Sequence, residues 1–131
     1  MLAAGAHVNA VGAIVPSRAE VSRDVLERAS RVVADSVPSA QKLSRELMEF
    51  FGPPDAEGWG RVEPLSSVVA ARAARRAGDD VTLFKSLGMG ISDLALGMEL
   101  YGRARERGLG REFPQPRRAT PRLRVARGSK H

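Results

Sequence analysis

Residues 81–90 read Val81-Thr82-Leu83-Phe84-Lys85-Ser86-Leu87-Gly88-Met89-Gly90. The first four are β-prone and apolar, which predicts a strand over residues 81–84. The glycines that follow predict a turn, and a helical apolar pattern begins directly after it. That helix is expected to end at Gly108 and to carry apolar side chains on one face: Ile91, Leu94, Ala95, Met98 and Tyr101.

Two earlier segments also have the character of strands. His7-Val8-Asn9-Ala10-Val11-Gly12 alternates and ends on glycine, and Arg31-Val32-Val33-Ala34-Asp35 is short and apolar, as a buried parallel strand should be. Residues 13–18 are predicted to form a loop, because Pro16 interrupts a ladder and biases its predecessor to an extended backbone.

Helical patterns separate these strands. The first is predicted to begin after Ser22 and to run to Ala29, with Ser22 as its N-cap. A second begins at Ser36 or Ser39 and is expected to continue as one helix until Gly52-Pro53-Pro54. Its apolar stripe consists of Ala40, Leu43, Leu47, Phe50 and Phe51.

A loop is expected over residues 55–60, with Trp59 packed over the core. Pro64 then suits the first turn of a third helix, which Arg75, Arg76 and Gly78 would close. Three strands alternating with four helices predict the α/β class, with a parallel sheet of about three strands, covering helices and two consecutive βαβ units. The first strand starts almost at Met1, so the chain has the organisation of the second half of a larger domain.

Composition excludes several classes of protein. The chain has 131 residues and no cysteine, which removes disulfides, thiolate nucleophiles and cysteine-ligated metals and suits a cytoplasmic location. No apolar run approaches the ~20 residues that span a bilayer, so no membrane partner is expected. The net charge of +6 comes from residues 102–131, which carry 10 Lys/Arg against two acidic residues. Nucleic acid is therefore an unexpected partner, because only a tail is basic.

Standard catalytic motifs are absent. Neither HExxH, Walker A nor an EF-hand pattern occurs, and Gly88-Met89-Gly90 is too short for a dinucleotide fingerprint. His7 lies in a predicted strand, where a structural role is the better interpretation, and His131 is terminal. We therefore assign no catalytic residue and no metal ligand from the sequence.

Two segments, in order, carry a specific resemblance. Gly5-Ala6-His7-Val8-Asn9-Ala10-Val11-Gly12-Ala13, followed by Pro16 and Glu20, is similar to a segment of the ornithine cyclodeaminase/mu-crystallin family. Thr82 to Ala95 resembles the same family's "TLF-x-S-x-G-x-A-x-x-D" signature. The resemblance covers roughly residues 1–110. It implies the C-terminal half of an incomplete Rossmann-like, doubly wound NAD(P)-binding domain plus the following helix, with residues 111–131 as a basic, loosely ordered Arg/Pro-rich tail.

The resemblance also implies the site residues. Matched motif to motif, the cofactor-binding positions are Val11, Gly12, Ala13, Arg18 and Ser86, and the substrate-binding positions are Ile14 and Leu87. Other interpretations remain open at this stage. Gly12 would serve equally as an ordinary strand end, Ser86 as a helix N-cap and Arg18 as a solvated charge.

Ile14 departs from the family's pattern. Ornithine cyclodeaminases carry there an aspartate that accepts and donates a proton, which an aliphatic side chain cannot do. The resemblance therefore implies an NAD- or NADP-dependent enzyme that reduces a cyclic imine (ketimine) or oxidises an amino acid, a homodimer when complete. The chain lacks the glycine fingerprint and the family's N-terminal lysine and arginine, so we expect it to be inactive by itself. Alternatives are a non-catalytic assembly subunit that pairs through an exposed sheet edge, and an ornithine cyclodeaminase proper.

Overall fold

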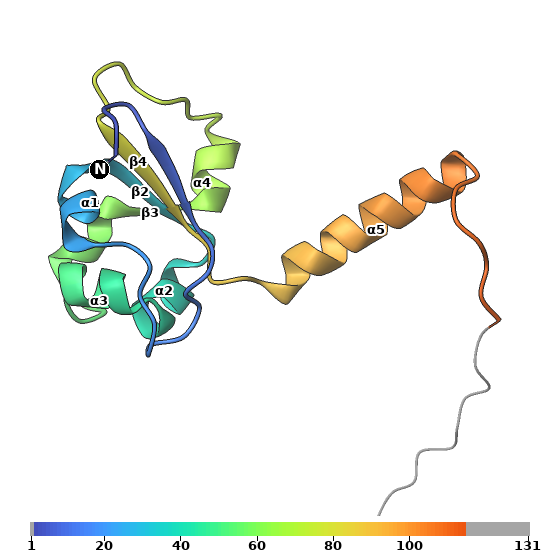
Figure 1. Ribbon diagram of the computed structural model, residues 1–131, viewed down its shortest axis with the longest axis horizontal. Helices are drawn as coiled ribbons and strands as arrows, with labels where there is room; N and C mark the ends of the chain where they lie inside the picture. The colour runs from blue at the N-terminus through green and yellow to red at the C-terminus, as the bar shows by residue number, and fades with distance from the viewer. Residues whose placement is uncertain (1, 115–131) are drawn as a thin grey trace, which may run out of the picture. The chain divides into compact units, whose positions relative to one another are not determined.

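The computed structural model describes residues 2–114 and contains one parallel sheet (Figure 1). Its four strands are β1 (His7–Ala10), β2 (Ala29–Ala34), β3 (Val62–Pro64) and β4 (Val81–Lys85), in the order β1-β4-β2-β3. The α/β class and the three predicted strands are confirmed. The sheet also has a fourth strand that the sequence did not indicate, because β3 is only three residues long and ends in a proline that cannot donate to a ladder. β3 accordingly lies at the edge of the sheet.

The last strand lies inside the sheet. β4 pairs with β1 on one side, where His7 is opposite Thr82, and with β2 on the other, where Ala34 is opposite Lys85. Of the two consecutive βαβ units that were expected, the second links β2 to β4, which are neighbours in the sheet, but β4 separates β1 from β2. This central position explains why four of the five residues of β4 are buried.

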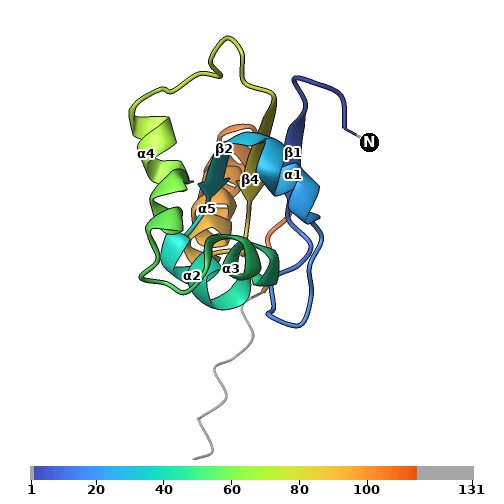
Figure 2. The same cartoon turned by 90° about the vertical axis from the view of Figure 1, so that its left-hand side faces the viewer.

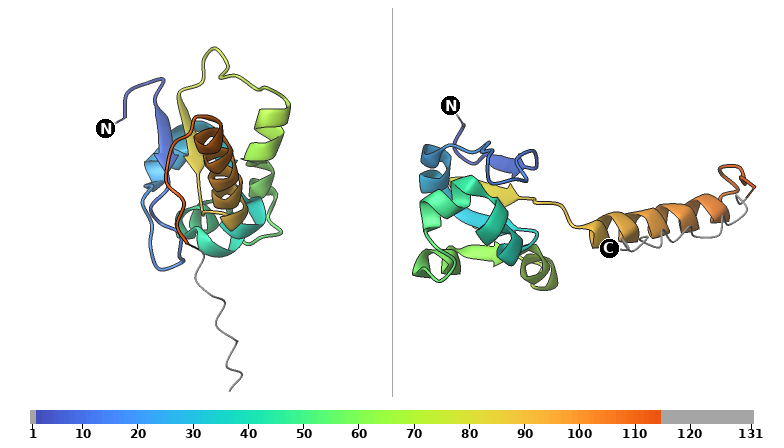
Figure 3. Two further views of the ribbon diagram at one scale, coloured as in Figure 1. Left: turned by 90° about the vertical axis from the view of Figure 1, so that its right-hand side faces the viewer. Right: turned by 90° about the horizontal axis from the view of Figure 1, so that it is seen from below.

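Helices cover both faces of the sheet. The short helices α1 (Arg23–Arg28), α2 (Val37–Leu43) and α3 (Arg45–Phe51) lie on one face, and α4 (Leu65–Ala70) lies on the other (Figures 2 and 3). This division follows from right-handed crossovers, because the chain reverses its direction of travel across the sheet between β3 and β4. The main core lies between the sheet and α1–α3, and its most deeply buried large side chains include Leu26, Leu47 and Leu83.

The long helix expected after residue 36 is two helices. Ser44 adopts an extended backbone (φ −90°, ψ 98°) and separates α2 from α3, while the apolar stripe continues across the break. The predicted sites of helix initiation at Ser36 and of termination at Gly52 are confirmed, since Ser36 caps α2 and Gly52 follows α3 at φ 89°. Ser22 precedes α1 as predicted, although its side chain makes no capping hydrogen bond.

The segment expected as a loop before β3 contains a 3₁₀ helix, η1 (Glu57–Arg61). It buries Trp59, whose indole nitrogen donates to the carbonyl of Gly52 at 3.0 Å. α4 ends at Ala70, earlier than the predicted closure near Gly78.

The final helix, α5 (Gly90–Glu106), is present as predicted and is followed by Gly108 in a left-handed conformation at φ 61°. Contacts divide the chain into two units, with the boundary between Leu96 and Gly97. No helix within residues 2–114 is long and apolar enough to cross a membrane. Most of the predicted tail, residues 115–131, lies outside the described residues.

Candidate functional site

The two segments that carry the predicted site residues end neighbouring strands. The chain leaves β1 at Val11 and leaves β4 at Ser86, and the backbone N–H of Ser86 donates to the carbonyl of Ala10 at 2.9 Å. Both loops therefore lie at the carboxyl edge of the parallel sheet. That edge is where ligands of open α/β sheets bind.

Asp35 joins this edge from β2 and organises the turn after β4. Its Oδ2 accepts hydrogen bonds from the Ser86 hydroxyl at 2.8 Å and from the backbone N–H groups of Leu87 and Gly88, both at 2.9 Å. Its Oδ1 accepts from the N–H of Ser36 at 2.8 Å. One carboxylate thus holds the turn in place, a role that sequence reasoning missed. The available signal was an acidic residue directly after a buried strand.

A second carboxylate organises the loop after β1. Glu20 accepts from the N–H of Gly12 at 2.9 and 3.0 Å, and from the N–H of Ala13 at 3.0 Å. Lys85 donates to the same carboxylate at 2.6 Å and to the carbonyl of Ala13 at 2.7 Å. Loop 11–20 is therefore tied to the end of β4 by a side chain that is completely buried.

Glu46 of α3 completes this charged cluster. Its Oε1 lies 3.1 Å from Lys85 Nζ as an ion pair, its side chain is 3% exposed, and neither of its oxygens accepts a hydrogen bond from any described residue. A single ammonium thus faces two carboxylates, Glu20 and Glu46. Sequence reasoning missed Lys85 and Glu46, because a lysine in a strand and a glutamate in a helix carry no local signal of pairing.

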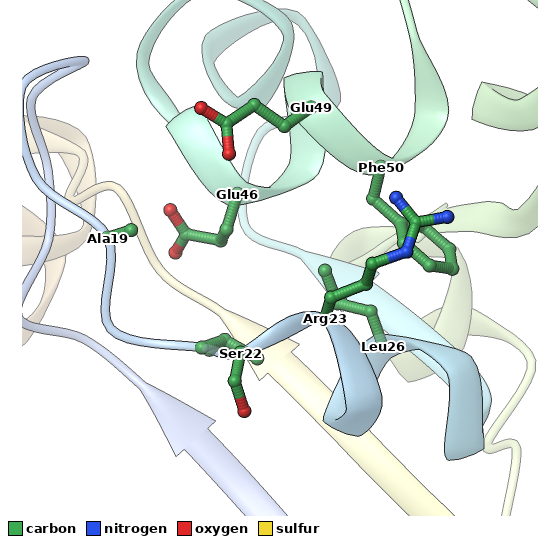
Figure 4. A pocket seen from close by; sticks show the side chains of 8 residues that line it. Ala19, Ser22, Arg23, Leu26, Glu46, Glu49 and Phe50 are labelled. Atoms are coloured by element: carbon green, nitrogen blue, oxygen red, sulfur yellow. The ribbon is translucent and has the colours of Figure 1, made fainter.

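Glu46 also lines a pocket of about 240 Å³ on the face of the sheet that α1–α3 cover. In Figure 4, Glu46 and Glu49 extend from α3 toward the segment that carries Ala19, while Arg23 lies against Phe50. The guanidinium carbon of Arg23 is 5.4 Å from the centre of the Phe50 ring. None of the predicted site residues lines this pocket.

The pKa of Glu20 reflects two opposed effects. Burial alone would raise it, but the hydrogen bonds from Lys85, Ala13 and Gly12, together with the positive charge of Lys85, outweigh burial and hold the pKa below its ordinary value. Glu20 is therefore an ionised hydrogen-bond acceptor at neutral pH. It is unsuited to donate a proton there.

The structure locates each predicted site residue. Gly12, Ala13 and Arg18 surround one open hollow at the carboxyl edge. Val11 and Ile14 are exposed to 61% and 47%. Ser86 is half-buried, and its hydroxyl bonds Asp35 rather than capping α5, which begins four residues later.

Leu87 lies in the hydrophobic core and is 5% exposed. Its contact with substrate stays a prediction. Gly12 has a structural reason of its own, since a Cβ at this position would lie 2.9 Å from Glu20 Oε2. The absence of a side chain at Gly12 thus allows the carboxylate to reach the backbone.

His7 lies away from the carboxyl edge. Its Nδ1 is 2.8 Å from the hydroxyl of Thr82 and its Nε2 is 3.2 Å from Oδ1 of Asn9. The described part of the chain contains no group of three or more His, Cys, Asp or Glu side chains that could hold a metal ion.

Known proteins resemble this chain in sequence and in fold. The profile of the ornithine cyclodeaminase/mu-crystallin family matches residues 1–108. A Delta(1)-pyrroline-2-carboxylate reductase of Bacillus cereus is 32% identical over 111 residues, which cover 81% of this chain and 33% of that protein.

Two solved structures resemble the fold. The probable ornithine cyclodeaminase from Bordetella pertussis Tohama I superimposes with a TM-score of 0.66 at 33% identity, over 83% of this chain and 35% of the other. The Thermococcus litoralis Delta(1)-pyrroline-2-carboxylate reductase, in complex with NADH and L-proline, gives 0.65 at 29% identity, over 86% and 35%. The chain spans about a third of the length of the curated relatives it matches.

Proposed function

The chain belongs to the ornithine cyclodeaminase/mu-crystallin family, and from this premise we propose that it forms the C-terminal part of an NAD(P)-dependent oxidoreductase. The proposed reaction is reduction of a cyclic imine (ketimine) or oxidation of an amino acid by hydride transfer. The observation that carries the proposal is the meeting of the two family segments at one sheet edge, through the hydrogen bond from Ser86 N–H to the carbonyl of Ala10.

The residues at this edge fit the nicotinamide end of NAD or NADP. The amides of Gly12, Ala13, Leu87 and Gly88 already donate to carboxylates, so they are not available to bind the phosphate oxygens of a dinucleotide. A hollow bounded by Gly12, Ala13 and Arg18 leaves room for a flat ring, with Ser86 on the adjoining loop. When bound, the cofactor supplies the hydride chemistry, and these residues hold and orient the ring.

Ile14 favours hydride transfer over cyclodeamination. Its side chain is exposed at the edge but cannot move a proton, and the carboxylate on the same loop, Glu20, is held ionised by Lys85. The described edge residues thus favour orientation of a cofactor over proton relay. The names of the matched reductases, and the complex of one with NADH and L-proline, support a small cyclic imine or amino acid as the substrate.

Three further parts of the proposal concern the whole protein. We propose a cytoplasmic homodimer in which residues 1–110 are the NAD(P)-binding part and residues beyond 110 a basic tail. An archaeal alanine dehydrogenase of the same fold is a dimer with bound NAD, which supports this arrangement. The absence of cysteine supports a reducing compartment.

The test is a titration of the ¹⁵N-labelled chain with NADH, followed by the amide signals of each residue. We expect saturable shifts at Gly12, Ala13 and Ser86 and none at the opposite edge, for example at Gly78. Because this chain spans a third of its relatives, the expected affinity is weak, and no turnover of NADH with a ketimine is expected. Shifts confined to other residues, or robust turnover by this chain alone, would contradict the proposal.

One observation favours a second candidate, an assembly subunit without catalysis. β1 pairs only with β4, so within residues 2–114 its other edge has no strand partner. Such an edge pairs readily with a strand of another chain. Sedimentation equilibrium tests this candidate, since a monomer at every concentration would exclude pairing between copies. A dimer that Asn9→Pro disrupts would support it, because Ala6 and Ala10 accept hydrogen bonds from β4 and the backbone of Asn9 therefore faces the unpaired edge.

A further inference from the structure

The buried cluster around Lys85 carries one formal negative charge in excess. Lys85 Nζ pairs with Glu20 at 2.6 Å and with Glu46 at 3.1 Å, so one ammonium serves two carboxylates. Glu20 also accepts from the amides of Gly12 and Ala13. Glu46 has no such help, because its side chain is 3% exposed and neither of its oxygens accepts a hydrogen bond from a described residue. A buried carboxylate in this condition needs hydrogen-bond donors from elsewhere.

Glu46 faces the pocket of about 240 Å³ that lies beside α3. In Figure 4 its carboxylate extends from α3 toward the segment that carries Ala19. Other walls of the pocket are apolar and include Val21, Leu26 and the ring of Phe50. The volume equals the share that about eight water molecules have in the liquid, so the pocket has room for a ligand of a few non-hydrogen atoms.

Two further charged side chains line the pocket, and both have partners. Glu49 pairs with Arg45 at 2.7 Å, and Arg23 pairs with Glu27 at 2.9 Å. Neither Arg23 nor any other described residue donates a hydrogen bond to Glu46. The pocket therefore combines a carboxylate that lacks donors with apolar walls, which favours a cation that carries a short hydrocarbon chain.

We propose that this pocket binds a small organic cation, with a primary ammonium group on Glu46 and a short apolar chain against Val21, Leu26 and Phe50. An ammonium group has three donors and no acceptor, which is what a carboxylate without donors requires. A calcium ion fits less well, since it takes six or more oxygen ligands and the described residues hold no cluster of three metal-ligating side chains. The site shares no residue with the proposed cofactor edge, so the inference goes beyond the proposed function.

Two probes of similar shape isolate the charge. The probe is n-butylammonium chloride at pH 7, and 1-butanol is its uncharged counterpart. Each is titrated into the ¹⁵N-labelled chain at constant ionic strength, and the amide signals of Ala19, Val21 and Phe50 are followed. We expect saturable shifts with n-butylammonium and at least about tenfold weaker binding of 1-butanol, the factor that a hydrogen bond to a charged group contributes.

Two variants assign that preference to the pocket. Glu46→Gln removes the charge at nearly constant shape and should bring the affinity ratio of the two probes close to one. Ala19→Leu keeps every charge but places a larger side chain in the pocket, and it should abolish binding of both probes. The matched control is Glu99→Gln, which removes one carboxylate from an exposed pair with Arg103 on α5 and should leave the ratio unchanged.

The outcomes decide the inference without reference to the cofactor. A preference for n-butylammonium that Glu46→Gln abolishes and Glu99→Gln retains, together with loss of binding in Ala19→Leu, supports it. Shifts that do not saturate at the pocket residues, equal binding of the two probes, or a preference that survives Glu46→Gln overturns it. The amide spectra report whether each variant is folded. If Glu46→Gln does not fold, binding that survives in Ala19→Leu overturns the inference and its loss there supports it.

Discussion

Lys85 Nζ lies 2.6 Å from Glu20 Oε1, although the two residues are 65 positions apart in the chain. The lysine ends the central strand β4 and is fully buried, and the glutamate belongs to the loop that follows β1. This ion pair sets the course of loop 11–20, because the same carboxylate binds the amides of Gly12 and Ala13. The shape of the candidate site therefore depends on an interaction beneath it.

Replacement of Lys85 by methionine tests how strongly the cluster depends on its ammonium. We expect Lys85→Met to lower the free energy of unfolding by about 3–5 kcal/mol, because Glu46 would be left buried without a cation. Urea denaturation measures the loss. The matched control is Arg45→Met, which breaks an exposed pair with Glu49 on α3 and should cost less than about 1 kcal/mol.

A double variant tests why Lys85→Met destabilises the protein. Adding Glu46→Gln to Lys85→Met removes the stranded charge, so the double variant should be more stable than Lys85→Met alone. Equal stability of the two would mean that lost packing, and not an unpaired carboxylate, destabilises the single variant.

Asp35→Ala should destabilise the protein more than its partly exposed position suggests. The substitution leaves the amides of Leu87 and Gly88 and the hydroxyl of Ser86 without their acceptor. We expect a loss of about 2–4 kcal/mol in the free energy of unfolding. Asp55→Ala, on an exposed loop, is the control and should change stability by less than about 0.5 kcal/mol.

Acid should weaken the tie between loop 11–20 and β4. The folded pKa of Glu20 lies below its unfolded value of about 4.3, so its contribution to stability is complete above that pH and is lost as the pH falls through the folded pKa. Glu20→Gln should therefore flatten the acid limb of the stability curve. The chemical shifts of the Gly12 and Ala13 amide protons should change with pH below about 4.3 in the original chain, as Glu20 is protonated, and should not change in Glu20→Gln.

Ser44→Ala should stabilise the protein. The hydroxyl of Ser44 is fully buried between α2 and α3 and has no hydrogen-bond partner among the described residues. Removing a buried, unsatisfied hydroxyl should raise the free energy of unfolding by about 1 kcal/mol. A loss of stability in thermal or urea denaturation would show that the hydroxyl is satisfied in solution.

Gly12→Ala should act through Glu20. The new methyl group would meet Glu20 Oε2 at 2.9 Å, so the carboxylate must withdraw from the two loop amides. We expect a cost of about 1–2 kcal/mol, comparable to one charged hydrogen bond. In a Glu20→Ala background the same substitution should cost much less, and a double-mutant cycle measures that difference.

Patterns within short stretches of the sequence correctly predicted β1, β2 and β4. The alternation of residues 7–12 and the apolar run of residues 31–35 became β1 and β2, and residues 81–84 became most of β4. β3 was not predicted, because three residues ending in proline do not make a strand pattern. The break between α2 and α3 at Ser44 was not predicted, because the apolar stripe has helical spacing on both sides of it.

In the candidate site too, the segments with a recognisable local pattern were predicted and the long-range contacts were not. The segments after β1 and β4 were predicted to share a site, and the structure brings them together at one edge. Asp35, Lys85 and Glu46 were not predicted, because each acts on residues that are 39 or more positions away in the chain. A strand order that places β4 next to both β1 and β2 creates these contacts, and no local pattern encodes that order.

The same strand order constrains how the protein is made. β1 leaves the ribosome before its partner β4, which begins at Val81, so β1 must wait unpaired while residues 11–80 are synthesised. β2 and β3 are closer in sequence and pair without β4. Synthesis that stops before residue 81 would leave β1 without its partner strand and Glu20 without Lys85, and such truncated chains should be substrates for chaperones and proteases.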